Sequence, residues 1–332
     1  MAKSEANWLV YMHIYRKEEG HERKTVKKMQ SNLQPGVAVY LLHFGPNTNS
    51  DAILTKYTNN DAREVLRFPN KSIPDVVKTL EKVSKHLIAS KVKVDAVCFA
   101  CHGASYGMGK WKTYRYPFLQ INDAVRYLVD PFGPSLVCFD SCFQGNMSCL
   151  YELPQNTKVV LASPAFHPFV SLLWTRAFGR LKRQMGKSEL LRYGHSITCE
   201  WNDLTKATWK CMLLFDMKYI PIIAKVVKEN FDLLLFDRIS QIDKEDANLH
   251  DLFAAARNLP DLQMMIIKSI ASTCERCLTS CTKRVRGMST EAHLPRKWLT
   301  AYSSTKWYKE IVKDQRGFRA EKLQEMLNDG KV

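Results

Sequence analysis

The sequence predicts a three-layer α/β fold, with a mostly parallel sheet between two layers of helices and a mainly helical C-terminal extension. Short apolar runs, typical of buried strands, alternate with charged or amphipathic stretches, typical of helices. This alternation favours a parallel sheet that is covered on both faces. Beyond about Thr198 the helical patterns dominate. We therefore predict one α/β domain over residues 1–230 and the extension over residues 231–332.

The predicted strands are short, apolar and rich in β-branched or aromatic residues. Right-handed crossovers place consecutive parallel strands side by side, or nearly so. A polar stretch that ends at Asn60 can hold a short hairpin. The predicted strands cover residues 8–12, 37–44, 94–100, 136–139, 159–162 and 211–215.

The predicted helices carry apolar residues at intervals of three and four. In the clearest case Ser72 is the capping residue, and Val76, Leu80, Val83 and Leu87 recur on one face. The pattern therefore predicts an amphipathic helix that packs against the sheet. The other predicted helices cover residues 18–30, 119–129, 219–227, 249–259, 262–281 and 319–327.

The chain is strongly basic: its 49 Lys and Arg against 33 Asp and Glu give a net charge of +16. Such a charge favours acidic partners, including nucleic acid, although charges spread along the chain are also typical of a solvated surface. Aromatic and basic residues interleave over residues 296–309, a composition found in single-strand nucleic-acid grooves and equally in amphipathic helices. The sequence therefore leaves a nucleic-acid or acidic partner open.

Cysteine usage and the N-terminus bear on the expected location. The ten cysteines lack the spacing of an extracellular disulfide framework, and several lie inside apolar runs. No signal-peptide pattern opens the sequence, and no apolar stretch approaches the length of a membrane-spanning helix. We therefore expect an intracellular protein, in the cytoplasm or nucleus, with no membrane partner.

Two of the predicted strands end at residues that can carry chemistry. His102 and Gly103 follow the strand at 94–100, and Asp140 and Cys142 follow the strand at 136–139. In open α/β sheets, ligands bind at the carboxyl ends of the strands. A histidine can act as base and acid for a cysteine nucleophile, and the N–H groups of Gly103 and Cys142 could stabilise an oxyanion. The pair is therefore a candidate acyl-transfer dyad.

The phrases His102-Gly103 and Asp140-Ser141-Cys142 resemble the caspase–haemoglobinase superfamily of cysteine peptidases, and most closely its clostripain-like branch. Other phrases similar to that branch follow in the same order at residues 8–12, 139–145, 160–164 and 214–217. The resemblance implies that residues 1–230 form a caspase-like catalytic domain. It also implies a cysteine endopeptidase that acts on polypeptides.

The resemblance also implies roles for individual residues. His102 would be the general base and acid, and Cys142 the nucleophile. Asp140 and Ser163 would bind substrate, with Asp140 selecting a basic P1 side chain through a charge-assisted pair. The chemistry would need no cofactor, and a structural metal ion, as in some relatives, is left open.

The sequence departs from the clostripain-like pattern at two places. Residues 15–17, Tyr-Arg-Lys, stand where the branch usually has an acidic cluster. Residues 166–169, Phe-His-Pro-Phe, stand where it usually has a glycine and sometimes a second acid. An alternative function is therefore a catalytically inactive caspase-like protein that binds nucleic acid or an assembly partner.

Two rival motifs overlap the histidine. Ser105, in Gly-Ala-Ser-Tyr-Gly, matches the nucleophile elbow of serine hydrolases, with Asp140 and either His167 or His195 as its partners. Residues 98–102, Cys-Phe-Ala-Cys-His, match a haem-attachment pattern. On a strand, however, residues three apart point to opposite faces, which would separate the two thiols.

A third rival motif lies in the extension. Cys274, Cys277 and Cys281 have metal-like spacing, and His293 could supply a fourth zinc ligand. The three cysteines would also share one face of a helix, so core packing explains the spacing equally well.

Overall fold

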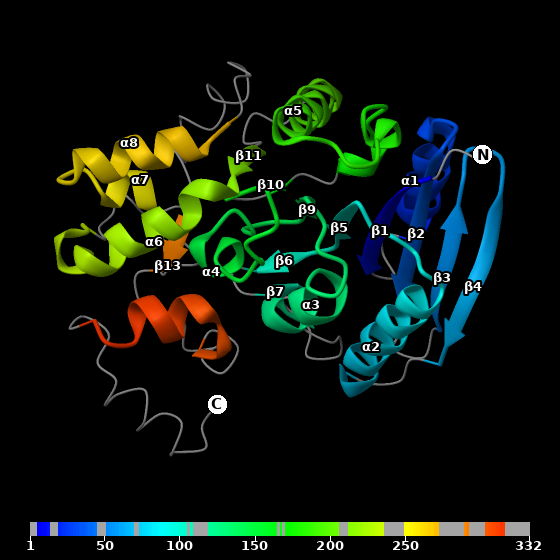
Figure 1. Ribbon diagram of the computed structural model, residues 1–332, viewed down its shortest axis with the longest axis horizontal. Helices are drawn as coiled ribbons and strands as arrows, with labels where there is room; N and C mark the ends of the chain where they lie inside the picture. Colours follow the sequence, from blue (N-terminus) through cyan, green and yellow to red (C-terminus); the bar gives the residue numbers. More distant parts are fainter. Residues whose placement is uncertain are drawn as a thin grey trace.

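A mixed sheet of eight strands runs through the protein (Figure 1). From edge to edge its strands are β11 (Leu213–Asp216), β10 (Val159–Ala162), β9 (Leu136–Asp140), β5 (Ala96–Ala100), β1 (Ala6–His13), β2 (Val37–Phe44), β3 (Ala52–Tyr57) and β4 (Ala62–Phe68). This computed structural model describes residues 5–13, 19–44, 51–69, 73–104, 107–108, 119–164, 167, 170–205, 212–235, 249–271, 289–291 and 303–315.

The middle of the sheet is parallel. Neighbouring strands from β10 through β9, β5 and β1 to β2 all run in the same direction. At one end of the sheet β11 pairs antiparallel with β10. At the other end β3 pairs antiparallel with β2, and β4 pairs antiparallel with β3. The predicted fold class, a mostly parallel sheet in an α/β protein, is therefore confirmed.

Helices cover both faces of the sheet (Figure 1). Alternate residues of β1 enter two different cores, because successive side chains of a strand point to opposite faces. Leu9 and Tyr11 join one core, and Trp8 and Val10 join the other. The first core is covered by α2 (Ile73–Ala89), α3 (Ile121–Leu128), α4 (Met147–Leu150) and α6 (Ile220–Glu229), and the second by α1 (Glu19–Asn32) and α5 (Lys187–Leu204).

One buried tryptophan ties the central strand to the segment that leads into α5. The ring of Trp8 stacks on Phe178 with centroids 4.1 Å apart, and its indole N–H donates to the Phe178 carbonyl over 3.1 Å. Phe178 begins η3 (Phe178–Arg180), which follows η2 (Leu172–Trp174). These contacts fix η3 against the central strand β1.

Several elements differ from the prediction. The hairpin expected before Asn60 is formed by β3 and β4 and extends to Phe68. The helix α5 was not predicted, because only one stripe of this largely polar helix is buried, through residues such as Leu190, Ile197 and Trp201. The helix predicted over 249–259 is instead a strand followed by one helical turn. A new helix then begins at Pro260, since proline is favoured in a first turn but cannot continue a helix.

Described residues beyond 230 pack into the same core as α2 and α6. Among them are Phe231, Ile266, Trp307 and Val312. The division of the chain at residue 230 stays a prediction. The helix predicted over 262–281 ends at Ser269. Its remaining residues from 272 to 281, and the helix predicted over 319–327, lie outside the described residues. The remaining elements are η4 (Met217–Tyr219), η5 (Phe231–Leu233), β12 (Leu249–Asp251), α7 (Leu252–Ala255), α8 (Pro260–Ser269), β13 (Ser289–Glu291) and η6 (Tyr308–Val312).

The two edges of the sheet are finished differently. On β4, Arg67 is exposed and pairs with Glu64 over 2.6 Å and with Asp51 over 3.1 Å. At the other edge, the N–H of Ala271 donates to the Leu214 carbonyl on β11 over 2.8 Å. A charged strand therefore borders one edge, and a later segment of the chain borders the other.

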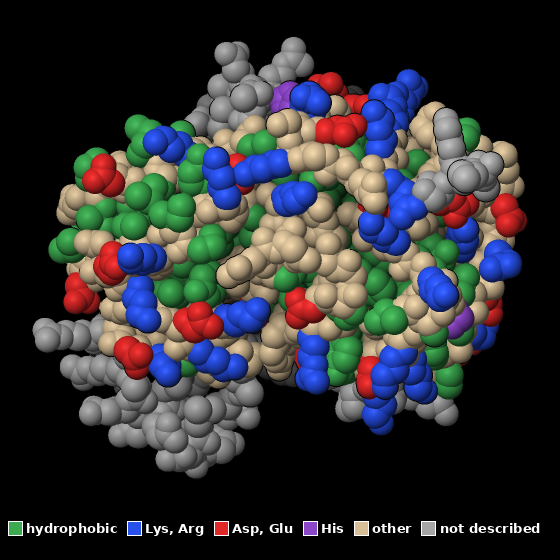
Figure 2. All heavy atoms as spheres, viewed as in Figure 1, with side chains coloured by type: hydrophobic (Ala, Val, Ile, Leu, Met, Phe, Trp, Pro, Cys, Tyr) green, Lys and Arg blue, Asp and Glu red, His purple; other side chains and the backbone are tan. Residues whose placement is uncertain are grey.

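The surface agrees with the spread of charge in the sequence. Figure 2 shows Lys and Arg side chains scattered over this face and interspersed with Asp and Glu. A nucleic-acid partner stays a prediction, and this view gives it no support. Within the described part of the chain, no helix combines the length and apolar character needed to cross a membrane.

Candidate active site

The ends of β5 and β9 bring His102 and Cys142 to the same edge of the sheet. The two strands are parallel neighbours, and Ala100 is in register with Asp140. His102 and Cys142 each stand two residues beyond this pair, so the backbone places them at equivalent positions. The sequence predicted this juxtaposition from the alternation of strands and helices.

Gly103 brings the two strand ends into direct contact. A Cβ atom on Gly103 would lie 2.1 Å from the carbonyl oxygen of Cys142 and 3.0 Å from its nitrogen. Both atoms belong to the backbone, so a side chain here could be accommodated only by moving the strand ends apart. Gly103 also opens a small sheet of β6 (Gly103–Ala104), β7 (Gly107–Met108) and β8 (Leu119–Gln120), which holds the chain that follows His102.

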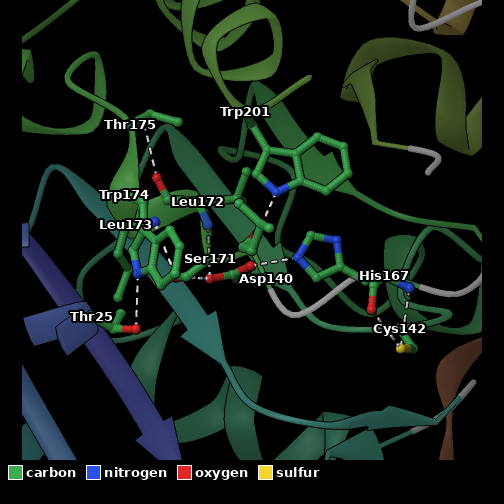
Figure 3. Close-up of polar contacts among 11 residues, drawn as sticks. Thr25, Asp140, Cys142, His167, Ser171, Leu172, Leu173, Trp174, Thr175 and Trp201 are labelled. Carbon is green, nitrogen blue, oxygen red and sulfur yellow. Dashed lines mark hydrogen bonds and ion pairs between the residues drawn. The ribbon is translucent and has the colours of Figure 1, made fainter. Parts of the chain in front are cut away.

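The thiol of Cys142 lies against the backbone of His167 (Figure 3). The His167 N–H donates to Sγ over 3.2 Å, and Sγ lies 3.7 Å from the His167 carbonyl oxygen. Burial raises the pKa of the Cys142 thiol above its ordinary value; the His167 N–H opposes this rise, and the negative charge of Asp140 adds to it. A resting thiol in this setting needs a base to become a nucleophile.

The turn after Cys142 is held in a tight conformation. Phe143 adopts a left-handed φ of 59°, which is uncommon for a residue other than glycine. Gly145 donates its N–H to the Ser163 carbonyl over 2.8 Å, and a Cβ on Gly145 would lie 2.7 Å from the nitrogen of Pro164. The turn after Cys142 is therefore held against the end of β10.

Asp140 is buried beneath this turn, and both its oxygens accept hydrogen bonds. Oδ1 lies 2.6 Å from Nε2 of His167, and the two side chains are only 3% and 6% exposed. Oδ2 accepts from the Ser171 hydroxyl and, over 3.1 Å, from the Leu172 N–H. The carboxylate therefore anchors the segment that leads into η2 (Figure 3).

The ring of His167 is held from a second side by α5. It stacks on Trp201 with centroids 5.0 Å apart and planes 8° apart. Trp201 is itself fixed, because its indole N–H donates to the Val170 carbonyl over 2.6 Å. Nδ1 of His167 is buried and has no hydrogen-bond partner among the described residues. The imidazole thus lies between a carboxylate and an indole.

The two predicted substrate-binding residues, Asp140 and Ser163, stand at strand ends on either side of the turn after Cys142. Asp140 is at the carboxyl end of β9, and Ser163 follows the neighbouring strand β10. Both residues are buried, Ser163 completely. Their role in binding substrate stays a prediction. Both oxygens of Asp140 already accept hydrogen bonds within the protein.

A group of histidines at the strand ends was not predicted. His13 ends β1, and its pKa is lowered to about 4, chiefly by burial and also by the nearby His43 and His102. The Tyr11 hydroxyl lies 3.3 Å from Nδ1 of His13, and Nε2 of His43 lies 2.8 Å from Oε1 of Glu22. The sequence could have indicated this group, because His13 and His43 stand at or next to the last residues of two adjacent strands.

His13 is expected to make the folded state sensitive to acid. Its pKa is about 4 in the folded protein against an ordinary value of 6.5, so only the unfolded chain takes up this proton between these values. The free energy of unfolding should therefore fall as pH is lowered, with His13 contributing a loss of about 2 kcal/mol between pH 7 and pH 5. Urea unfolding of wild type and His13→Gln at both pH values measures this contribution.

His86→Gln, on α2, is the matched control and should retain the full wild-type loss. If His13→Gln loses as much stability as wild type between the two pH values, His13 is not the sensitive group.

The residues of the rival motifs are only partly described. Ser105 lies outside the described residues. Two of its suggested partners, Asp140 and His167, are hydrogen-bonded to each other. Its other suggested partner, His195, instead lies 3.5 Å from the sulfur of Cys199. The serine-hydrolase alternative therefore stays a prediction.

The metal and haem patterns also receive no support. Cys98 belongs to one core, whereas Cys101 packs against the other, so the two thiols do point to opposite faces. The four candidate zinc ligands, Cys274, Cys277, Cys281 and His293, lie outside the described residues. Within the described part, no group of three or more His, Cys, Asp and Glu side chains could hold a metal ion.

Comparison with solved structures identifies proteins with the same fold. A secreted C11 cysteine protease from Bacteroides thetaiotaomicron, in complex with an irreversible peptide inhibitor, is 13% identical with a TM-score of 0.67, over 94% of this chain and 100% of that chain. A second structure of a secreted C11 protease from that organism is 10% identical with a TM-score of 0.62, over 93% and 100% of the two chains. An inactive zymogen C11 protease from Parabacteroides distasonis is 10% identical with a TM-score of 0.59, over 94% and 99%.

The chain therefore has the α/β fold of the C11, or clostripain-like, cysteine proteases, as its motifs predicted. No protein-family model matches the sequence, and no curated protein matches it either. The likeness is one of structure, spread over nearly the whole chain at low sequence identity.

The comparison corrects the predicted location. Two of these structures are of proteases described as secreted, which points away from the predicted intracellular location. The prediction depended in part on the cysteines, and the structure shows why they are uninformative. Cys98 and Cys138 are buried in neighbouring strands, where they fill the core as small apolar side chains, so their free thiols do not report on the compartment.

Proposed function

We propose that this protein is a cysteine endopeptidase in which Cys142 is the nucleophile and His102 is the general base and acid. The observation that carries the proposal is the contact between Gly103 and the Cys142 backbone, which joins the two strand ends that carry these residues. The fold shared with C11 cysteine proteases supports the same reaction class.

The reaction follows from the roles of these groups. His102 takes the thiol proton as Sγ of Cys142 attacks the carbonyl carbon of the scissile bond. The N–H groups of Gly103 and Cys142 donate to the developing oxyanion. His102 then protonates the leaving amine, and water hydrolyses the thioester with His102 as base. These steps need no cofactor.

The environment of Cys142 makes the base important. Because burial and Asp140 hold the pKa of the thiol above its ordinary value, little thiolate forms unaided at neutral pH. A proton acceptor at the adjacent strand end therefore determines whether the sulfur reacts. The alternative of a catalytically inactive protein predicts a Cys142 whose reactivity is independent of His102.

Site-specific labelling tests the proposal. The native protein is treated with iodoacetamide or with a fluorophosphonate, and the labelled residues are mapped by mass spectrometry. We expect one equivalent of iodoacetamide at Cys142, and His102→Ala should slow this alkylation at least about tenfold at pH 7, in line with general-base contributions. Cys199, a partly exposed thiol on α5, reports non-specific reactivity and should react equally in both proteins.

The other outcomes separate the alternatives. Labelling of Ser105 by the fluorophosphonate, with an inert Cys142, would favour the serine hydrolase. Equal alkylation of Cys142 with and without His102 would favour the inactive protein.

A further inference from the structure

The inference concerns the choice of substrate at the proposed active site, and it rests on the proposed function. The resemblance assigns Asp140 to the recognition of a basic P1 side chain. A carboxylate can do this only if an acceptor lone pair faces the cleft and the incoming cation can reach it. The surroundings of Asp140 can therefore be compared directly with that requirement.

Asp140 does not meet the requirement. Nε2 of His167 is 2.6 Å from Oδ1, while Oδ2 accepts from the Ser171 hydroxyl and the Leu172 N–H. The Asp140 side chain is 3% exposed. A lysine or arginine side chain would first have to displace the imidazole.

Displacement of the imidazole is opposed by the contacts of His167 itself. Its ring is stacked on Trp201, and its backbone N–H is bonded to Sγ of Cys142. Moving the residue would therefore break a bond to a buried carboxylate, an aromatic contact and the contact with the nucleophile together. Breaking a buried, charge-assisted pair by removing one partner is strongly unfavourable.

We propose that His167 is the specificity-determining residue of this site. Its imidazole is hydrogen-bonded to the Asp140 carboxylate, where a substrate cation would otherwise bind. The enzyme therefore cleaves after uncharged P1 residues rather than after lysine or arginine. Asp140 then acts as a positioning residue that holds His167 and the segment leading into η2, and it does not contact the substrate.

A set of peptides that differ only at P1 tests this proposal. The peptides carry Gln, Leu, Lys or Arg at P1, and kcat/KM is measured for each. Wild type should favour the better uncharged residue over Lys and Arg at least about tenfold. His167→Ala frees Oδ1 of the carboxylate and should raise the ratio of Lys to Gln at least about tenfold, since this buried oxygen, left without a donor, can then accept a charge-assisted bond from the substrate cation.

Three further variants separate specificity from general damage. His167→Gln keeps an N–H donor for Asp140 and should retain the wild-type order of peptides. Combining His167→Ala with Asp140→Asn removes the charge and should cancel the gain for Lys. His195→Gln is the matched control. It changes a different histidine, which lies on α5, and should leave the profile unchanged.

The outcomes distinguish this inference from the proposed function. A wild-type preference for Lys or Arg would overturn the inference and leave the peptidase intact, as would an unchanged Lys-to-Gln ratio in a folded His167→Ala. If His167→Ala does not fold, the wild-type profile and the His167→Gln profile decide. Failure to cleave any peptide, together with an unreactive Cys142, would instead overturn the proposed function.

Discussion

Cys142→Ala should lower kcat/KM for peptide hydrolysis by at least about 10³-fold, because removal of a nucleophile leaves only binding and oxyanion stabilisation. The substitution removes a single sulfur atom, so circular dichroism and thermal melting should stay close to wild type. The kinetic assay uses the P1 peptide that wild type cleaves fastest. Cys199→Ala is the matched control and should keep wild-type activity.

A double variant tests whether the two residues act together. His102→Ala should cause a loss of similar size, and adding it to Cys142→Ala should cost almost nothing more, since members of one catalytic unit are strongly non-additive. Independent, multiplying losses would show that His102 does not serve Cys142.

Gly103→Ala should lower kcat/KM at least about 10²-fold, the effect expected for the loss of one oxyanion donor. The new Cβ would lie 2.1 Å from the Cys142 carbonyl oxygen, so the two strand ends must separate. Separation would move the Gly103 N–H and His102 away from the sulfur. Steady-state kinetics, together with the rate of Cys142 alkylation, measure the two consequences.

Gly20→Ala provides the comparison for this variant. Gly20 lies in α1, and apart from its chain neighbours and the backbone of its own helix no atom would come within 4 Å of its Cβ. Alanine is a better helix former there, so activity should be unchanged and stability slightly raised. Full activity in Gly103→Ala would contradict the close contact between the strand ends.

The sequence was most informative where strands are buried on both faces. The ranges 37–44 and 159–162 match β2 and β10 residue for residue, because continuous apolar runs leave little doubt about position. The helix α5 was missed because a mostly polar segment gains its stability from one buried stripe. Such a stripe is recognisable only when the surface that it contacts is known.

For the candidate site, the sequence indicated which residues stand at strand ends but not which of them bond. His102, Asp140 and Cys142 were found because each follows a predicted strand. The bond between Asp140 and His167 joins residues 27 positions apart, and the sequence around His167, after β10, has no regular pattern. The sequence paired them only as partners of Ser105, because spacing gave no means of placing the imidazole over the carboxylate.

The two finished edges of the sheet have a consequence for self-association. An open ladder of backbone groups invites strands from other molecules, and this leads to dimers or fibrils. Here the Ala271 N–H donates to the Leu214 carbonyl at one edge, while the opposite edge presents guanidinium and carboxylate groups. Growth by addition of strands is thereby disfavoured at both ends, so contacts between copies would have to use the helical faces.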